Sequence, residues 1–563
     1  MTVILAVGMQ RILKKGGLVR RLASAETLGS TSIIATDKTA TLTEGKMKVV
    51  EVIGDKSLIL KTVVLTSQAF IENPEASVDQ WIVRGESTDQ ALLLAAITAG
   101  FNKDELDKHK IAEMPFNPAN KLAATVLKEA GRNNLYVCGA PEAVLALSQL
   151  TAREGQQWKK KLDQLAGKGL RIVAAGYKTD LNSAIDFKEI INNLTFTGLI
   201  ALRDPVRPEV KEAINLCRQA GMRPIIITGD HKLTAKAVAE ELDWNIGDED
   251  ILEGKDLDKL NDDGLDKILT RIQIYARVEP KDKMRIITAW QKRGKVVAMI
   301  GDGVNDAPAL KKADIGVALG SGTEVAKEAA DLILLNDSFA IIVAAVEEGR
   351  AILDNIRKVI TYLLSDTFSE VVLVGVSILA GVPLPITAVQ ILWINLMEDG
   401  LGDIALAFEP KEEDLMKQKP QGHDLPLLTK EMKTIIFIIG LITDLILLGL
   451  FFWLWRQNYP IDYIRSIIFT TLTIDSLLYI FSCKSLRKNI WQVDFFSNKL
   501  LLVAFGSSLL MLILALYFPF FQNFLEIVPL GFYDWLIVLG LGLVELLGIE
   551  AAKWFFISQH QTA

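Results

Sequence analysis

Six apolar stretches follow one another after residue 350, and they restrict the possible fold of this chain more than any other feature. They lie at about 357–380, 386–407, 434–455, 463–482, 500–520 and 534–557. A helix of about 20 residues crosses the roughly 30 Å of hydrocarbon in a bilayer. Trp and Tyr stand near several ends of these stretches, as they do at membrane interfaces. The pattern predicts an integral, multi-pass protein whose residues 347–563 form an all-α bundle of six membrane helices in the lipid bilayer.

Lys and Arg are concentrated in some of the connections between these stretches and absent from others. The segments around Arg350, Lys411 and Lys484 are basic, whereas the connections 381–385 and 521–533 hold no Lys or Arg. Basic connections stay on the cytoplasmic side, so we expect the preceding soluble part to be cytoplasmic as well. The compact chain without regulatory tails favours a prokaryotic plasma membrane.

The residues from about 14 to 350 alternate short apolar runs with charged, amphipathic runs, which predicts an α/β fold for the soluble part. A net charge of −7 gives no reason to expect a nucleic-acid partner. The three cysteines have no CxxC spacing, which argues against a disulfide framework and a thiolate metal site. Residues 1–8 are apolar and precede Arg11 and Lys14, without a small-residue cleavage site. We interpret residues 1–23 as the end of a membrane or stalk helix and not as a signal peptide.

Three apolar runs of the soluble part end in polar residues suited to phosphoryl transfer. The run 32–36 ends at Asp37, the run 225–227 at Thr228-Gly229-Asp230, and the run 296–300 at Gly301-Asp302-Gly303-Val304-Asn305-Asp306. Open α/β sheets bind ligands at the carboxyl ends of their strands. We therefore expect the three segments to belong to one site.

Each of these residue types has a role in phosphoryl transfer. The carboxylate of Asp37 can attack phosphorus and form an aspartyl phosphate. Thr228 and the following backbone N–H groups can hold phosphate oxygens, and Lys283 offers a positive charge. The carboxylates of Asp302 and Asp306 suit a hard cation such as Mg²⁺.

The segments Asp37-Lys38-Thr39-x-Thr41-Leu42-Thr43, Thr228-Gly229-Asp230 and Gly301–Asp306 resemble the signature of P-type cation-transporting ATPases. The resemblance implies a haloacid-dehalogenase-like phosphorylation domain at 24–45 and 198–346. It also implies that Asp37 is phosphorylated and that Asp37, Asp302 and the Thr39 backbone hold Mg²⁺. By the same resemblance Thr228 and Lys283 bind phosphate, and the phosphate site includes Thr41, Gly229, Asp230, Asn305 and Asp306.

The family uses an insertion like residues 46–197 as an α+β nucleotide-binding domain for ATP. Thr88-Asp89-Gln90 resembles its acidic motif near adenine, and Phe116 resembles the aromatic residue that stacks on the base. The residues that the resemblance implies in nucleotide binding are Asp89, Phe116, Lys121, Arg171 and, in the hinge motif that leads back to the phosphorylation domain, Arg207.

Several acidic and amide residues lie inside the apolar stretches, where an acidic side chain is costly and marks a functional site. Oxygen donors without Cys or His favour a hard cation, Ca²⁺ above Zn²⁺ or Cu⁺. The arrangement resembles the calcium-pump branch of the family, although a pump for a monovalent cation stays open. The candidate ligands of the transported ion are Thr367, Glu370, Asn395, Glu398, Asp399 and Asp475.

The sequence departs from the family at places that affect the chemistry. Ala40 replaces a glycine of the phosphorylation motif, and Cys138 replaces the lysine of a nucleotide motif. The family's actuator domain carries a Thr-Gly-Glu loop that is absent from this sequence. We therefore expect a truncated or split pump, working with a separate amino-terminal half that carries the actuator domain.

Two other functions compete with the pump. One is a catalytically impaired membrane subunit that binds nucleotide. The other is a membrane-anchored phosphatase of the dehalogenase type, which is disfavoured because Thr39 stands where those enzymes carry a second aspartate.

Overall fold

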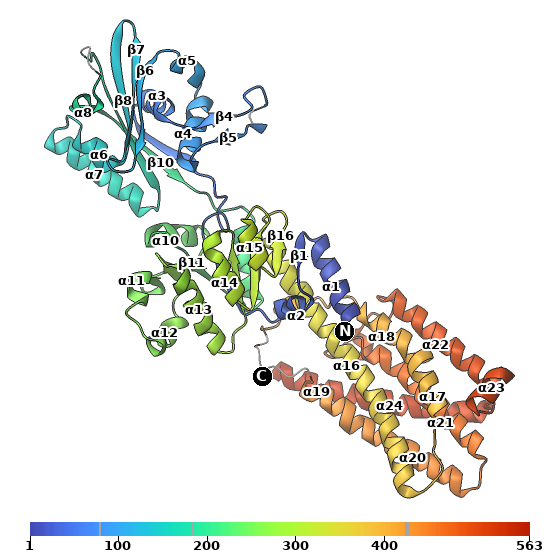
Figure 1. Ribbon diagram of the computed structural model, residues 1–563. Coiled ribbons are helices and arrows are strands. Elements are labelled where there is room, and N and C mark those ends of the chain that lie inside the picture. The colour runs from blue at the N-terminus through green and yellow to red at the C-terminus, as the bar shows by residue number, and fades with distance from the viewer. Residues whose placement is uncertain (78–79, 182–184, 421, 423–427, 563) are drawn as a thin grey trace. The chain divides into compact units, whose positions relative to one another are not determined.

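The computed structural model describes residues 1–77, 80–181, 185–420, 422 and 428–562, apart from the side chains of Glu398 and residues 559–562. The chain divides into two compact units. One consists of Met1–Ser32 and Ile341–Ala563 and contains the long apolar helices. The other, Ile33–Ala340, contains the two large sheets (Figure 1).

A parallel sheet forms the first half of the soluble unit. Within residues 33–340 its strand order is β16-β15-β14-β2-β11-β13-β12. The strands are β2 (Ile33–Thr36), β11 (Arg223–Ile227), β12 (Ile251–Glu253), β13 (Ile274–Ala276), β14 (Val297–Gly301), β15 (Ile315–Leu319) and β16 (Leu332–Leu334). Strand β2 pairs with β14 on one side and with β11 on the other, in parallel. All four residues of β2 are buried, as expected for a parallel strand covered on both faces.

Helices cover this sheet and fix the positions of the loops at its edge. They are α9 (Val210–Gln219), α10 (Lys232–Glu241), α11 (Gly254–Leu257), α12 (Asp262–Leu269), α13 (Pro280–Lys292), α14 (Ala307–Lys312) and α15 (Glu324–Ala329). Ile286 and Trp290 of α13 pack in one core with Ile33 and Ala35 of β2. Pro280 at the first helical position and a Glu279–Asp282 capping box define the start of α13.

An antiparallel sheet with the order β3-β10-β9-β8-β7-β6 forms the other half of the soluble unit. Its strands are β3 (Lys48–Gly54), β6 (Lys110–Asn117), β7 (Leu122–Glu129), β8 (Arg132–Gly139), β9 (Arg171–Lys178) and β10 (Thr195–Arg203). Helices α3 (Lys56–Thr66) and α4 (Ser87–Thr98) pack on one face, and α6 (Pro141–Ala146) and α7 (Ala152–Gly167) on the other. The remaining elements are β4 (Phe70–Ile71), β5 (Val83–Arg84), α5 (Lys103–Asp107) and α8 (Phe187–Ile190). Strand β10 runs past the expected domain boundary at residue 197, and the expected boundaries stay predictions.

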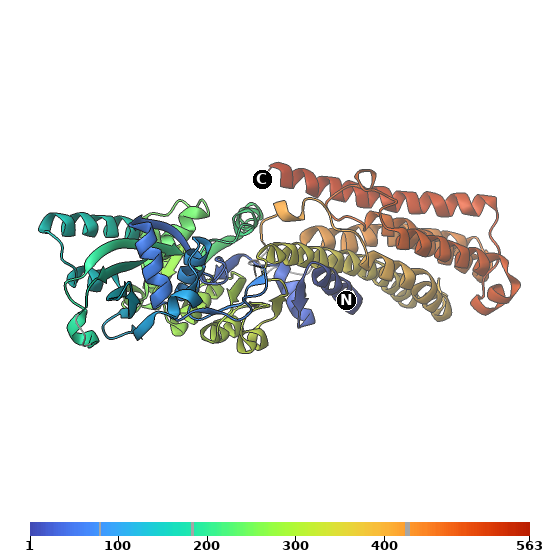
Figure 2. The ribbon, with the colours of Figure 1, turned by 90° about the horizontal axis from the view of Figure 1, so that it is seen from above.

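The other unit is helical except for the short strand β1 (Gly17–Val19). Its helices are α1 (Thr2–Lys14), α2 (Leu22–Gly29), α16 (Ala340–Ala380), α17 (Ala388–Trp393), α18 (Gly400–Ala407), α19 (Lys430–Lys433), α20 (Gly440–Arg456), α21 (Ile461–Ser482), α22 (Lys499–Tyr517), α23 (Pro519–Leu525) and α24 (Phe532–Thr562). The long helices lie side by side as a bundle in both views (Figures 1 and 2). Of the most apolar 18-residue window in α21, 78% is buried inside the bundle, compared with 17% in α16, so α21 is a central helix.

In the described residues, five helical segments are long and apolar enough to cross a membrane: Ala340–Ala380, Lys430–Arg456, Ile461–Ser482, Lys499–Tyr517 and Phe532–Ser558. They support a multi-pass membrane protein. The expected second span, 386–407, is not among them, so the six-helix bundle is not confirmed. This segment consists of α17, a π-helical segment (Ile394–Asp399) and α18, and it contains the acids Glu398, Asp399 and Asp403. The three acids lower its hydropathy, and π-helical turns are frequent at functional sites.

Candidate active site and ion-binding region

Asp37 follows β2 at the carboxyl end of the parallel sheet, where open α/β sheets bind ligands. Its backbone N–H donates to the Ile300 carbonyl at 3.0 Å and so ties the residue to β14. The Lys38 backbone N–H donates to Asp37 Oδ1 at 2.7 Å. The carboxylate is therefore fixed by the main chain, and its side chain keeps 17% exposure toward solvent.

Lys283, in the first turn of α13, connects two of the sequence-predicted carboxylates. Its Nζ lies 3.0 Å from Asp37 Oδ2 and 2.7 Å from Asp306 Oδ1. Burial opposes the lysine charge, but Asp37 and Asp306 outweigh it and raise the pKa of Lys283. Burial raises the pKa of Asp37, although Lys283 acts in the opposite direction. A buried positive charge therefore lies against the oxygen atoms of Asp37.

The residues that follow β11 form a second polar cluster. Asp230 Oδ2 accepts hydrogen bonds from Thr39 Oγ1 at 3.0 Å and Thr228 Oγ1 at 3.3 Å, and Lys38 Nζ lies 2.8 Å from it. These partners lower the pKa of Asp230 against the effect of burial. Gly229 lies between Thr228 and Asp230, and Thr41 Oγ1 is buried without a hydrogen-bond partner in the described part of the chain. The structure thus joins the loop after β2 to the loop after β11.

Arg207 and Asp204 hold the loop that follows Asp37. The Arg207 guanidinium donates to the Ala40 carbonyl at 2.8 Å and to the Thr43 carbonyl at 3.0 Å. Thr43 Oγ1 donates to Asp204 Oδ2 at 2.5 Å. Ala40 has a φ of 58°, in the left-handed region that favours glycine. The Arg207 side chain thus contacts the loop that follows Asp37, and its expected part in nucleotide binding stays a prediction.

Asp302 follows β14 and brings a further carboxylate close to Asp37. Burial raises its pKa to about 6, and Asp306 and Asp37 act in the same direction. Asp306 is buried and accepts from Lys283 and from the Gly303 backbone N–H at 3.2 Å, whereas Asn305 is exposed. The three carboxylates of Asp37, Asp302 and Asp306 thus carry more negative charge than Lys283 compensates.

This excess of acidic groups fits Mg²⁺, which binds one or two carboxylates and takes its other ligands from water and phosphate. Within the described residues, no three His, Cys, Asp or Glu side chains are arranged to hold a metal ion. Asp37, Asp302 and the Thr39 backbone carbonyl would therefore hold Mg²⁺ only together with oxygen atoms of the substrate.

A pocket of about 730 Å³ opens on the antiparallel sheet. Four residues predicted to bind nucleotide line it: Asp89, Phe116, Lys121 and Arg171. Phe116 is 52% exposed, and Leu92, Ile172 and Val173 supply further apolar surface. Pockets of this volume and mixed polarity bind small organic ligands.

Cys138 lines the same pocket, at the position of the lysine in the family motif. Burial raises the pKa of its thiol to about 12, so the side chain is uncharged at neutral pH. Lys121 lies 3.5 Å from Glu142, which partly neutralises its charge. The pocket wall therefore carries less positive charge than the family motif would provide.

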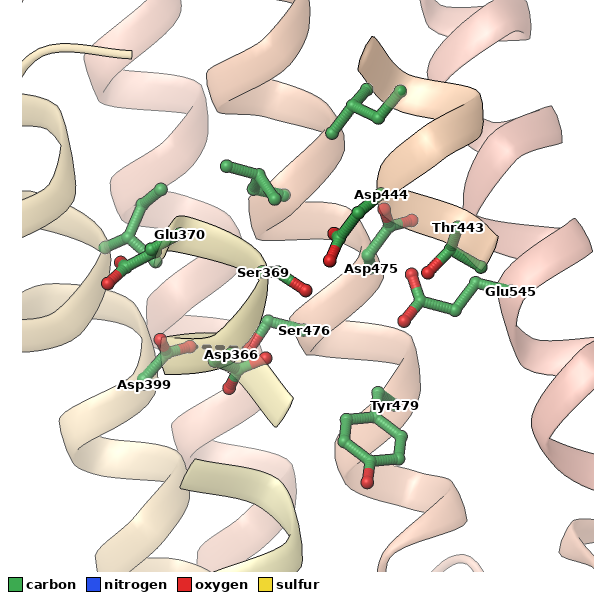
Figure 3. Close-up of a pocket in the computed structure, with 13 residues that line it drawn as sticks. Asp366, Ser369, Glu370, Asp399, Thr443, Asp444, Asp475, Ser476, Tyr479 and Glu545 are labelled. Atoms are coloured by element: carbon green, nitrogen blue, oxygen red, sulfur yellow. Dashed lines mark hydrogen bonds between the residues drawn. The ribbon is translucent and has the colours of Figure 1, made fainter. Parts of the chain in front are cut away.

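A small cavity of about 30 Å³ lies among the long helices (Figure 3). Its acidic lining residues are Asp366 and Glu370 of α16, Asp399, Asp444 of α20, Asp475 of α21 and Glu545 of α24. Asp399 Oδ1 accepts from Tyr362 at 3.0 Å and from Ser476 at 2.6 Å. Asn395 Nδ2 donates to Glu370 Oε1 at 2.9 Å.

The structure brings together part of the predicted ion-binding set. Glu370, Asp399 and Asp475 line the cavity, and Asn395 reaches it through Glu370. Thr367 is exposed and does not line it, and the Glu398 side chain lies outside the described residues. Sequence reasoning missed Asp444 and Glu545, although each is an acid inside an apolar stretch, which is a signal of function.

Three parts of this chain match known protein families. Residues 56–209 match the family described as "P-type ATPase, cytoplasmic domain N", residues 284–342 match "haloacid dehalogenase-like hydrolase", and residues 383–555 match "Cation transporting ATPase, C-terminus". The calcium-transporting ATPase of Bacillus subtilis is 34% identical over 96% of this chain, and calcium-transporting ATPase 1 of Bacillus cereus is 34% identical over 98%. Calcium-transporting ATPase 1 of Lactococcus lactis is 33% identical over 98%.

This chain belongs to the P-type ATPase family and matches a carboxyl-terminal portion of it, which confirms the resemblance found in its motifs. The chain spans 66% of the length of each of the two Bacillus relatives, slightly less than two thirds. The haloacid-dehalogenase-like match agrees with the parallel sheet that carries Asp37.

Proposed function

We propose that this chain carries the catalytic and ion-binding machinery of an ATP-driven cation pump. ATP phosphorylates Asp37, and the transported cation is Ca²⁺. The contact of Lys283 with both Asp37 and Asp306, at the end of a central strand, is the observation that supports this most strongly. The choice of Ca²⁺ is supported by the names of the relatives and by a cavity lined with oxygen donors.

In the proposed reaction, an oxygen of the Asp37 carboxylate attacks the terminal phosphorus of ATP. A new P–O bond forms to Asp37, while the bond to the leaving oxygen breaks and ADP departs with that electron pair. Lys283 stabilises the negative charge that surrounds the transferred group. Thr228, Thr41 and the backbone at Gly229 donate hydrogen bonds to the phosphoryl oxygens, and Asp230 keeps Thr39 and Lys38 in position.

Asp37, Asp302 and the Thr39 carbonyl would hold Mg²⁺, which supplies positive charge to the phosphate oxygens when bound. Asp306 does not take part as a ligand in this proposal. It fixes Lys283 and the Gly303 backbone, so that the lysine stays directed at Asp37.

The pocket of the antiparallel sheet binds the nucleotide in this proposal. The exposed ring of Phe116 stacks on the base, Asp89 contacts its polar edge, and Lys121 and Arg171 face the phosphates. The ion binds in the helical unit to Glu370, Asn395 and Asp399, with Asp475 on the adjacent helix.

The host membrane and the cellular side of the catalytic unit also belong to the proposal. We place the catalytic unit in the cytoplasm of a prokaryotic cell, at the plasma membrane, from the distribution of Lys and Arg. The hypothesis of a truncated or split pump, with a separate amino-terminal half, stays a prediction.

Phosphorylation by labelled ATP tests this function. The full chain, incubated with Mg²⁺ and Ca²⁺, should form an acid-stable, hydroxylamine-sensitive phosphoenzyme. Asp37→Asn should abolish it, and Asp263→Asn, on the exposed side of α12, should not. Folded protein that binds ATP but is never phosphorylated would instead support the impaired nucleotide-binding subunit, which Ala40 and Cys138 favour. Phosphorylation that depends on Na⁺ or K⁺ in place of Ca²⁺ would support a monovalent-cation pump.

A further inference from the structure

A separate small cavity of the helical unit is lined mainly by basic residues. It has a volume of about 20 Å³, and its lining comes from α16, the end of α2 and the connections 408–429 and 483–498. Of its nine lining residues, four are basic and one is acidic: Arg350, Arg357, Lys419 and Arg487, and Asp354. The cavity is distinct from the sites proposed above for ATP and for the transported ion.

The part of α16 that lines this cavity lies close to the bilayer. Arg350, Asp354 and Arg357 are spaced by four and three positions, which places them on one face of the helix. Helix α16 is long and apolar enough to cross a membrane, and its apolar stretch begins at residue 357. Arg357 therefore lies near the level of the lipid headgroups.

The acids nearest to the cavity are already paired with other basic groups. Asp354 Oδ2 lies 2.7 Å from Lys358 Nζ, and its Oδ1 lies 3.0 Å from Arg487 Nη1. Glu412 Oε1 lies 3.3 Å from Lys358 Nζ and 3.6 Å from Arg487 Nη2. The two carboxylates thus compensate the charges of one lysine and one arginine.

Two guanidinium groups of the cavity retain donors that are not used. Arg357 Nε and Arg487 Nη2 are buried and have no hydrogen-bond partner in the described residues. Glu431 of α19 attracts Arg357 only from beyond ion-pair distance. A buried donor without a partner is costly, so an acceptor that enters the cavity would be stabilised there.

The wall opposite α16 is held in place by the backbone. Arg350 Nη1 donates to the Leu415 carbonyl at 2.9 Å and to the Gln418 carbonyl at 2.8 Å. The next residue, Lys419, is exposed and lines the cavity, so a ligand can reach the cavity from the surface. A volume of about 20 Å³ holds one or two water-sized particles, which suits the oxygen atoms of a group whose remainder lies outside.

We propose that Arg357, Lys419 and Arg487 bind a phosphate group, and that this phosphate belongs to the headgroup of an anionic lipid. The planar N–H donors of arginine match the oxygen atoms of a phosphate. Basic pockets between membrane helices, on the side where Lys and Arg are concentrated, bind anionic headgroups. Such a lipid would join α16 to the two connections that follow α18 and α21.

Native mass spectrometry of the full chain, released from lipid nanodiscs of equal parts phosphatidylcholine and phosphatidylglycerol, tests the proposal. The unchanged chain should retain phosphatidylglycerol in preference to phosphatidylcholine. Arg357→Gln should reduce this preference at least about tenfold, because a charged donor to the phosphate is lost. Lys419→Gln, at an exposed position, should also reduce it and remains informative if the arginine variant does not fold. Lys499→Gln, at the exposed start of α22, is the matched control and should retain the preference.

A second arm distinguishes a lipid from free phosphate. Equilibrium dialysis with labelled inorganic phosphate should show no binding that Arg357→Gln removes. Phosphate binding that is lost in this variant, without a lipid preference, would keep the phosphate site but overturn the lipid as its source. If lipid and phosphate binding are equal in the unchanged chain and both variants, or if Lys499→Gln loses the preference as well, the site is overturned. Neither arm uses ATP or Ca²⁺, so the result is independent of the proposed pump.

Discussion

At the scale of single residues, Ala40 and Lys283 show how the loop that follows Asp37 is held. Ala40 adopts a left-handed backbone conformation, which costs roughly 1 kcal/mol for a residue with a Cβ atom. The guanidinium of Arg207 and the hydroxyl of Thr43 bond to its backbone and keep it in this conformation. Lys283 in turn compensates the charge of the Asp37 and Asp306 carboxylates. The loop is thus strained at one residue and stabilised electrostatically at another.

Ala40→Gly should relieve this strain. We expect a gain of about 0.5–1 kcal/mol in the free energy of unfolding, because glycine adopts a positive φ without a steric cost. Thermal unfolding of the full chain measures it. Ala130→Gly is the matched control, since Ala130 has a φ of 46° in an exposed turn outside the sites. A lower stability of Ala40→Gly, with a gain at Ala130, would contradict this account of the loop.

Lys283→Met should reduce the rate of phosphorylation at least about 100-fold, because it removes a positive charge placed against the developing negative charge. Lys281→Met is the control on the same helix, where the lysine is exposed and pairs with Glu279. Rapid-quench measurements with labelled ATP give both rates. Two variants with similar rates would show that Lys283 has only a structural role.

The pKa of Asp302 predicts a pH dependence. Because this carboxyl has a pKa of about 6, it is protonated below pH 6 and must lose a proton to bind Mg²⁺. The Mg²⁺ concentration that gives half-maximal phosphorylation should rise about tenfold per pH unit below 6 and stay constant above it. Asp302→Asn should remove this dependence along with tight Mg²⁺ binding. An unchanged Mg²⁺ requirement from pH 5 to 7 would exclude Asp302 as a ligand.

At the scale of helices and strands, the three short apolar runs of the soluble part could be predicted, because parallel strands are buried on both faces. The polar residues at their ends are brought together by β2, β11 and β14, as expected. The segment 386–407 is different, since its acids and π-helical turns interrupt the apolar pattern of a span. Asp444 and Glu545 were missed because the sequence does not show which faces of α20 and α24 meet α21.

Helix α16 also shows a contact that composition does not reveal. A Cβ atom at Gly349 would lie 2.5 Å from the Gly29 backbone nitrogen at the end of α2. At Gly375, in the same helix, a Cβ atom would meet nothing within 4 Å. The two helices therefore touch through their glycine backbones.

Gly349→Ala should lower the free energy of unfolding by about 1–3 kcal/mol, because the added methyl group forces the two helices apart. Gly375→Ala should leave stability unchanged or raise it slightly, since alanine favours the helix. Thermal unfolding in the same lipid nanodiscs compares the two variants. Equal stabilities would mean that α2 and α16 adjust to the methyl group without cost.

At the scale of the whole molecule, the proposed pump requires that ion binding in the helical unit controls chemistry at Asp37. The family and its α/β and helical parts could be predicted from motifs and hydropathy, because each motif lies in a contiguous stretch of sequence. The shape of the acidic cavity among the long helices could not, because its lining comes from α16, α20, α21, α24 and the segment around Asp399.

Asp399→Asn tests this control. Phosphorylation from ATP should lose its dependence on Ca²⁺ or require at least about tenfold more Ca²⁺, because a carboxylate ligand is lost from the membrane site. ATP binding, followed by a fluorescent nucleotide, should be unchanged. Phosphorylation with the same Ca²⁺ dependence as the unchanged chain would separate the two units functionally.

The central claim is that Asp37 accepts the terminal phosphoryl group of ATP. Its most direct test is to incubate the full chain with ATP, Mg²⁺ and Ca²⁺, reduce the acyl phosphate with labelled borohydride, and sequence the peptides by mass spectrometry. The account predicts label on Asp37 and none in the Asp37→Asn chain. Label on another residue, with Asp37 unmodified in protein that hydrolyses ATP, would contradict it.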